Sequence, residues 1–216
     1  MTKLMNISEL SKSLNLINPK SNEVVGTLSA REVFNKIVHG AWKNGEPGMI
    51  FLDQVNKDNH VIDTYGEMIA TNPCGEQPLL GNESCNLGSI NLAKFYQRSD
   101  GPTHGWQEKI DWSRLEHVIQ TSVHFLDNVI DANKYATPEI EQMTKSTRKI
   151  GLGVMGFADL LIQMQVPYKS KLAREIGSKL MHKIREVADQ ESLDLAVKRG
   201  VFPAWENSNY DRETEQ

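Results

Sequence analysis

The chain has 216 residues, enough for one or two domains with a sizeable core. Its formal net charge is −4, which gives no support for broad electrostatic binding to nucleic acid or to an anionic membrane. No apolar run approaches the roughly 20 residues of a membrane span, and the N-terminus lacks the apolar core of a secretory signal. Two cysteines make no disulfide scaffold, so we expect a reducing compartment, with the cytoplasm as the default.

The first third of the chain predicts two short extended pieces joined by a turn, followed by a helix. Residues 1–26 form a polar lead-in, in which a turn within NPKSNEVVG joins two short extended pieces. Ser29 and Glu32 then fit a helix capping box, and the apolar residues that follow recur at helical spacing. NGEPG at 44–48 ends this helix, and MIFLD at 49–53 predicts a short buried strand.

The second half of the chain predicts further helices. One covers about 112–133, and two more are expected over 151–165 and 171–199, the last followed by Gly200 in the position favoured after a helix end. The acidic, turn-rich segment ENSNYDRETEQ, 206–216, has no obvious core to join, and we assign 211–216 as a polar tail. We therefore expect an α/β chain that is mostly helical, with a few short strands that close no sheet by themselves.

A literal G-x-G-x-x-G pattern occurs at Gly151, Gly153 and Gly156. A dinucleotide-binding loop of this form follows a strand. The upstream segment EIEQMTKSTRKI is polar and does not predict a strand. We reject the dinucleotide-binding interpretation and expect the glycines to allow close helix packing.

Both cysteines lie in the turn-rich segment TNPCGEQPLLGNESCNLGSINL, residues 71–92. They could form a disulfide, bind a metal, be buried as small hydrophobes, or take part in redox or radical chemistry. Zinc commonly needs four ligands in closely spaced pairs, and no second pair exists. Pro73 and Gly75 place Cys74 in a tight turn, which argues against simple burial. The six histidines complete no ligand pattern, and we expect them to be solvated or at the core edge.

Three side chains of this segment are expected to face one ligand. In a locally extended loop Asn72, Cys74 and Glu76 project to the same side, because alternate positions share a face. An amide, a thiol and a carboxylate together could bind a substrate hydroxyl, attack a nearby atom and move a proton. A further turn at 81–82 could return Cys85 towards Cys74.

Residues 70–95, ATNPCGEQPLLGNESCNLGSINLAKF, resemble the active-site finger loop of the ribonucleotide reductase large chain. The loop is most similar to that of the class II, adenosylcobalamin-dependent enzymes. SAREVFNKIVHGAWKNGEPGMIFLDQVNKDN at 29–59 and TRKIGLGVMGFADLL at 147–161 are similar to the same family, in the same order. The resemblance therefore extends over about 18–210.

The resemblance assigns a role to each candidate residue. It implies that Cys74 becomes a thiyl radical and removes the ribose 3′ hydrogen, and that Glu76 is the base at the 3′ hydroxyl. It implies that Asn72 hydrogen-bonds the ribose hydroxyls. Cys85 would be one half of the dithiol that reduces the 2′ carbon and ends as a disulfide.

The resemblance also implies a larger assembly. The fold would be part of a ten-stranded α/β barrel, with residues 27–210 as a partial barrel domain and the finger loop, 70–92, threading its centre. No cysteine precedes Cys74 to complete the dithiol, the family's phosphate-binding segment would lie after Tyr210, and Gly81 stands where the family usually has proline. We therefore expect a middle fragment or split subunit, completed by N-terminal and C-terminal segments or chains.

The implied cofactor is adenosylcobalamin, with a radical from a metal-bearing partner subunit as the alternative. The implied partners are a ribonucleotide substrate and a thioredoxin-like reductant, with no direct nucleic acid and no membrane. Two other functions stay open: an inactive fragment or interaction module of a split reductase, and a simple Cys74–Cys85 redox switch.

Overall fold

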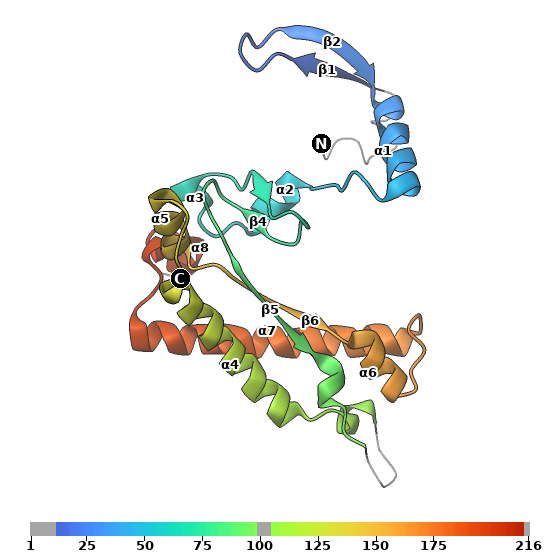
Figure 1. Cartoon of the computed structure of the whole chain (residues 1–216), viewed down its shortest axis with the longest axis vertical. Helices are drawn as coiled ribbons and strands as arrows, with labels where there is room; N and C mark the ends of the chain where they lie inside the picture. The colour runs from blue at the N-terminus through green and yellow to red at the C-terminus, as the bar shows by residue number, and fades with distance from the viewer. Residues whose placement is uncertain (1–11, 99–104, 214–216) are drawn as a thin grey trace. The chain divides into compact units, whose positions relative to one another are not determined.

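The computed structural model describes residues 12–98 and 105–213, and it divides the chain into two compact units, Met1–Gly81 and Asn82–Gln216. In the part of the chain that it describes, no helix is both long enough and apolar enough to cross a membrane. Each unit is built around its own elements (Figure 1).

The described part of the first unit starts with the two predicted extended pieces, which pair as a hairpin, and the predicted helix. Strands β1 (Ser13–Ile17) and β2 (Val24–Ser29) pair antiparallel, and α1 (Ala30–Asn44) follows directly. The Ser29 hydroxyl accepts a hydrogen bond from the third residue of α1, and Gly45 ends the helix in the left-handed conformation. Both helix boundaries confirm the sequence prediction.

The strand predicted at 49–53 is wrong. The chain continues instead into three short helices: α2 (Leu52–Val55), the 3-10 helix η3 (Asn56–Asp58) and α3 (Ile62–Tyr65). A strand needs a neighbour for its backbone N–H and C=O groups, and the described strands of this unit pair only with one another. The Phe51 carbonyl accepts from the backbone N–H groups of α2 instead.

The first unit ends in a second, shorter hairpin. Strand β3 (Ala70–Thr71) pairs antiparallel with β4 (Pro78–Leu79), and buried Leu80 follows. Residues 72–77 form the turn between these strands, so the hairpin holds the first candidate cysteine.

The second unit is organised around two parallel strands. β5 (Asn86–Asn91) lies beside β6 (Ile150–Met155), and α4 (Trp112–Ala132) packs against both strands and against α7 (Lys171–Arg199), as Figure 1 shows. The other elements of this unit are η4 (Leu92–Phe95), η5 (Trp106–Lys109), α5 (Pro138–Thr147), α6 (Phe157–Gln163), η6 (Pro203–Trp205) and α8 (Asn209–Glu213).

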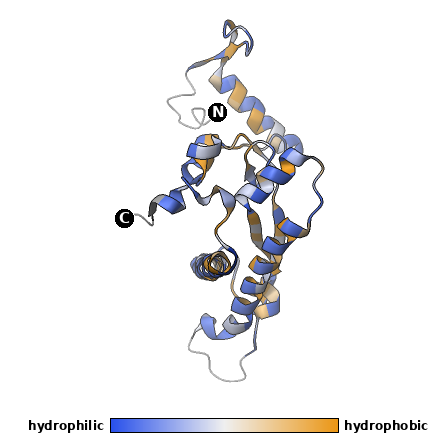
Figure 2. Ribbon diagram, turned by 90° about the vertical axis from the view of Figure 1, so that its left-hand side faces the viewer, coloured by the Kyte–Doolittle hydropathy of each residue, from blue (hydrophilic) through white to orange (hydrophobic). Residues whose placement is uncertain are grey.

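The core of the second unit lies between its two long helices and the strands. The predicted helices over 112–133 and 171–199 are confirmed, and hydrophobic residues recur between hydrophilic ones along α4 (Figure 2). The buried residues of these helices are Leu115, Ile119, Val123, Leu126 and Ile130 in α4, and Ala173, Ile176, Leu180, Ile184, Val187 and Leu195 in α7.

The single helix predicted over 151–165 is wrong, because its first part is a strand. Gly151 and Gly153 lie inside β6, so their expected role in helix packing is also wrong. Ile150, Leu152 and Val154 alternate with smaller residues, which is the period of a strand. β5 supplies the hydrogen-bonding neighbour, and α6 begins only after Gly156.

The mixed α/β architecture expected from the sequence is confirmed, and its longer elements are helices. Within the described ranges, 12–98 and 105–213, the strands form three two-stranded sheets.

Candidate functional site

The turn between β3 and β4 positions three of the four candidate residues. The Asn72 side-chain oxygen accepts from the Gln77 backbone N–H at 2.9 Å, and the Asn72 N–H donates to the Gln77 carbonyl at 3.2 Å. The Asn72 carbonyl also accepts from Gly75 N–H at 3.0 Å, where Gly75 has a φ of 87°. Asn72 therefore closes the turn through hydrogen bonds of its side chain and of its backbone.

This geometry confirms the tight turn around Cys74 and corrects the extended loop. Because residues 72–77 turn back on themselves, the alternate-face argument for Asn72, Cys74 and Glu76 does not apply. The Asn72 carboxamide oxygen is engaged by its own turn. Its NH₂ group is the part that could donate to a substrate hydroxyl oxygen.

The reactive groups of the turn lie at the surface of their own unit. Cys74 is a free, exposed cysteine, and the Glu76 side chain is exposed as well. A Cβ placed on Gly75 would meet nothing within 4 Å, so space is open beside both residues. The hairpin presents these groups without enclosing them.

Two asparagines that sequence reasoning missed brace the chain that enters β3. The Asn56 side chain accepts from Met68 N–H at 2.8 Å and donates to the Met68 carbonyl at 3.1 Å, as a neighbouring strand would. Asn59 is 1% exposed and donates to Asn56 and to the Gly66 carbonyl. The only signal in the sequence is the N-x-x-N spacing in a polar loop, which gives no indication of these partners.

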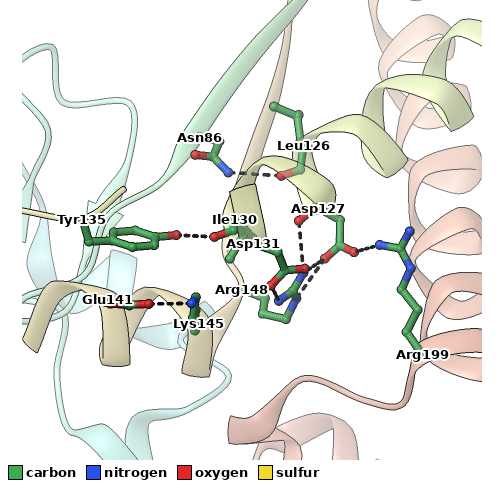
Figure 3. A network of polar contacts seen from close by, with 10 residues as sticks. All are labelled: Asn86, Leu126, Asp127, Ile130, Asp131, Tyr135, Glu141, Lys145, Arg148 and Arg199. Atoms are coloured by element: carbon green, nitrogen blue, oxygen red, sulfur yellow. Dashed lines mark hydrogen bonds and ion pairs between the residues drawn. The ribbon is translucent and has the colours of Figure 1, made fainter. Parts of the chain in front are cut away.

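Cys85 lies directly before β5 and is half-buried. Its thiol donates to the Asn86 carbonyl at 3.3 Å. On one side, the Ser84 backbone N–H and hydroxyl both contact the Thr144 hydroxyl, at 3.1 and 2.7 Å. On the other, the Asn86 amide donates to the Leu126 carbonyl at 3.1 Å (Figure 3).

A buried ion pair lies two residues before Cys85. Glu83 accepts from Lys149 at 2.7 Å, and the Glu83 side chain has no exposed surface, whereas that of Lys149 is 23% exposed. The partners are separated by 66 residues in the sequence. Sequence reasoning missed both, because no local pattern connects a loop glutamate with a lysine at a strand start.

Arg148, next to Lys149, connects the end of α5 to α4. It takes the left-handed conformation at the end of α5 and donates to both carboxylates on α4, Asp127 and Asp131 (Figure 3). Arg199, at the end of α7, also binds Asp127. The hydrogen bond from Arg148 holds the pKa of Asp131 below its usual 3.8, and the carboxylate partners raise the pKa of Arg148.

These charged residues line a cavity of about 380 Å³ between α4, the start of β6 and the end of α7. Two arginines and two aspartates balance in charge, and each makes an ion pair within the set. The arrangement can fix the corner between α5 and β6, and so the chain position of Lys149.

The histidines that the structure describes are all exposed, which confirms the expected solvated role for those five. His124 contacts Arg199 at 2.8 Å and Glu191 at 3.9 Å, so it belongs to the edge of the charged set on α4 and α7. His104 lies outside the described residues.

Comparison with protein families identifies the class to which this chain belongs. A family model described as ribonucleotide reductase, barrel domain, matches residues 8–216. Because the match covers nearly the whole sequence, the chain belongs to the ribonucleotide reductase barrel-domain family. The resemblance found in the finger loop is thereby confirmed.

Two of the most similar relatives are both named vitamin B12-dependent ribonucleoside-diphosphate reductase. The chain is 48% identical over 200 residues to a vitamin B12-dependent ribonucleoside-diphosphate reductase of Thermoplasma acidophilum, covering 93% of this chain. It is 45% identical over 197 residues to a protein of the same description from Mycobacterium tuberculosis, covering 91% of this chain. The chain spans only 25% and 27% of the length of these two relatives.

A solved structure shares the fold. The class Id ribonucleotide reductase alpha subunit of Actinobacillus ureae superposes with a TM-score of 0.67 and 22% sequence identity. The superposition covers 82% of this chain and 34% of that one.

Proposed function

We propose that this chain supplies the finger loop of a ribonucleotide reductase, which converts ribonucleotides to deoxyribonucleotides by thiyl-radical chemistry. The observation that carries the proposal is the β3–β4 hairpin, which presents the Cys74 thiol at an open turn between Asn72 and Glu76. The family match and the two vitamin B12-dependent relatives support it.

Each candidate residue has a role in this proposal. A Cys74 thiyl radical takes the ribose 3′ hydrogen and later returns it. Glu76 accepts the proton of the 3′ hydroxyl, and the Asn72 NH₂ group donates to a ribose hydroxyl. Cys85 and a second thiol, outside this chain, give two electrons and two hydrogens. The C2′–O bond breaks, a C2′–H bond forms, the oxygen leaves as water, and the thiols become a disulfide.

The chain's residues fit the cofactor that its relatives' names indicate. Adenosylcobalamin, when bound, supplies the radical that takes a hydrogen atom from a thiol. Cys74 suits this use because it is exposed and has open space beside it at Gly75, so a bulky group can approach the sulfur. The alternative source of the radical is a metal-bearing partner subunit, which would also require an accessible Cys74 thiol.

The proposal requires further polypeptide. We propose that residues 27–210 form part of a ten-stranded barrel, with 70–92 at its centre, and that reductase segments on either side complete the walls around the substrate. The partners are then a ribonucleotide, these segments and a thioredoxin-like reductant. The exposure of Cys74 and Glu76 favours one competing function, an inactive fragment or interaction module.

A reconstitution assay tests the proposal. The purified chain is mixed with the complementary segments of a vitamin B12-dependent relative, a ribonucleotide, a dithiol and adenosylcobalamin. We expect deoxyribonucleotide to form, Cys74→Ser and Cys85→Ser to abolish it, and Glu76→Gln to slow it by about 10² to 10⁴, the usual contribution of a general base. Glu67→Gln changes an exposed carboxylate outside the turn and serves as the matched control.

The outcomes separate the candidate functions. Full activity of Cys74→Ser would contradict the radical assignment, and a wild-type chain without activity in any mixture would favour the inactive module. Activity without cobalamin, in the presence of a metal-bearing subunit, would identify the alternative radical source. Rapid formation of a Cys74–Cys85 disulfide in the isolated chain, with no activity in the mixture, would favour the redox switch.

A further inference from the structure

The segment around Cys85 is held by residues of two helices of its own unit and by the link between α5 and β6. Ser84 is tied to Thr144 near the end of α5, and Asn86 to the Leu126 carbonyl of α4. Glu83 is tied to Lys149, directly before β6. Two residues before Cys85 and one after it, at the first position of β5, are thus fixed by distant partners.

Of these contacts, the Glu83–Lys149 ion pair should cost the most free energy to break. A carboxylate with no exposed surface loses its hydration, and an unpaired charge in such a place is strongly destabilising. Lys149 is partly exposed, so its ammonium group can remain hydrated while it compensates Glu83. Separating the Glu83 carboxylate from Lys149 is therefore unfavourable, and the ion pair fixes the backbone two residues before Cys85.

The Thr144 hydroxyl adds a second constraint. Thr144 is 1% exposed and accepts from the Ser84 backbone N–H, while its hydroxyl also pairs with the Ser84 hydroxyl. Moving Ser84 away from α5 would leave buried polar groups without partners. Arg148 also holds this corner, through the aspartates of α4.

We propose that Glu83, Lys149 and Thr144 are positioning residues that fix the Cys85 thiol for its redox reaction. A disulfide forms only when the two Cβ atoms come within about 3.5–4.5 Å in a narrow range of torsion. A cysteine in a loose loop would meet that geometry rarely, whereas the tethers give Cys85 one fixed place. The purpose, though not the geometry, depends on the proposed role of Cys85.

The rate at which Cys85 reacts with iodoacetamide tests the positioning directly. The full chain carries Cys74→Ser, so that Cys85 is its sole thiol. We expect Glu83→Gln and Thr144→Val each to raise the alkylation rate about tenfold, equivalent to about 1.4 kcal/mol easier local opening. Lys149→Arg keeps the charge pair, so its alkylation rate should stay near that of the parent.

A matched control breaks another lysine–glutamate pair of the same unit. Lys183 binds Glu116 at 2.9 Å between α7 and α4, and neither contacts the Cys85 segment, so Lys183→Met should leave the alkylation rate unchanged. Far-ultraviolet circular dichroism checks that each variant is folded. If Glu83→Gln unfolds, the alkylation rate of Thr144→Val relative to the parent tests the proposal instead.

Unchanged alkylation in folded Glu83→Gln and Thr144→Val would overturn the proposal. An equal increase in Lys183→Met would do the same, because the effect would then be general loosening. The measurement needs no reductase activity, so its failure is separate from failure of the proposed function. If alkylation responds as expected but Cys85→Ser keeps full activity in the reconstituted enzyme, the role of Cys85 is wrong while the tethers remain.

Discussion

At the scale of single residues, Gly156 shows how one position controls the contact between neighbouring strand ends. Its φ is 70°, a left-handed conformation that side chains disfavour. A Cβ at this position would also collide with the Asn91 side-chain oxygen, which caps η4 by accepting from Ala93 N–H. The end of β6 can therefore lie against the end of β5 only because residue 156 has no side chain.

We expect Gly156→Ala to destabilise the chain by about 2 kcal/mol or more, the sum of left-handed strain and overpacking. The measurement is the urea midpoint of unfolding, followed by circular dichroism. Gly153→Ala is the matched control, since its Cβ would meet only ordinary contacts at 3.7 and 3.8 Å and φ is not left-handed. Equal midpoints for the two variants would contradict this account of Gly156.

At the scale of elements, the corner between α5 and β6 depends on charge. Arg148 leaves α5 in the left-handed conformation and binds Asp127 and Asp131, four residues apart on α4. These aspartates lie one turn apart on the same helix face, so one guanidinium can bind both. The arrangement couples α4 to the start of β6, next to the lysine that binds Glu83.

Acid should weaken this coupling. The Arg148 hydrogen bond lowers the pKa of Asp131 below 3.8, so the ionised carboxylate stabilises the folded chain at neutral pH. That contribution is present above the unfolded pKa and is lost as the pH falls through the lower folded pKa. Asp131→Asn should therefore lower Tm near neutral pH, and the difference from wild type should shrink below about pH 4.

The size of this effect is limited by exposure. The Asp131 side chain is 59% exposed, so we expect Asp131→Asn to lower the free energy of unfolding by about 0.2–1 kcal/mol at neutral pH. The measurement is the Tm of both proteins between about pH 2 and pH 7. Asp189→Asn removes an exposed partner of Arg185 at 3.4 Å and should change Tm less. A Tm difference that grows towards acid pH would contradict the assignment.

At the scale of the whole molecule, the first unit leaves much apolar surface uncovered. Both strands of the β1–β2 hairpin carry exposed aliphatic side chains, among them Ile17 and Val25, and Trp42 on α1 is 80% exposed. Figure 2 shows hydrophobic and hydrophilic residues alternating along α1. Such surface normally marks a site of interaction, which agrees with a chain that spans about a quarter of its relatives' length.

We expect the isolated chain to bind a hydrophobic fluorescent dye such as ANS, because exposed apolar patches bind it. Adding the complementary reductase segments should reduce the fluorescence as this surface becomes covered. Trp42→Ser together with Val25→Thr should reduce it without partners, whereas Lys43→Ser, an exposed polar change on α1, should not. Dye binding that is equal in all these samples would show that this surface is not what the segments cover.

Local patterns determined much of this protein by themselves. The capping box at Ser29, the Gly200 stop and the apolar spacing of 112–133 and 171–199 each act within a few residues, so they could be predicted. The tight turn around Cys74 follows from its proline and glycine in the same way. The finger-loop sequence is also sufficient by itself to indicate the family, which the family match confirms.

Tertiary structure decided what depends on distant partners. Residues 150–155 are a strand because β5 lies beside them, and 49–53 are not, because none of the strands that the structure describes pairs with them. The place of Cys85 depends on Thr144 and Lys149, more than 55 residues away, and on the Leu126 carbonyl. Sequence specifies which side chains can pair, but only folding determines which of them meet, since burial and hydrogen bonding are satisfied across the whole unit.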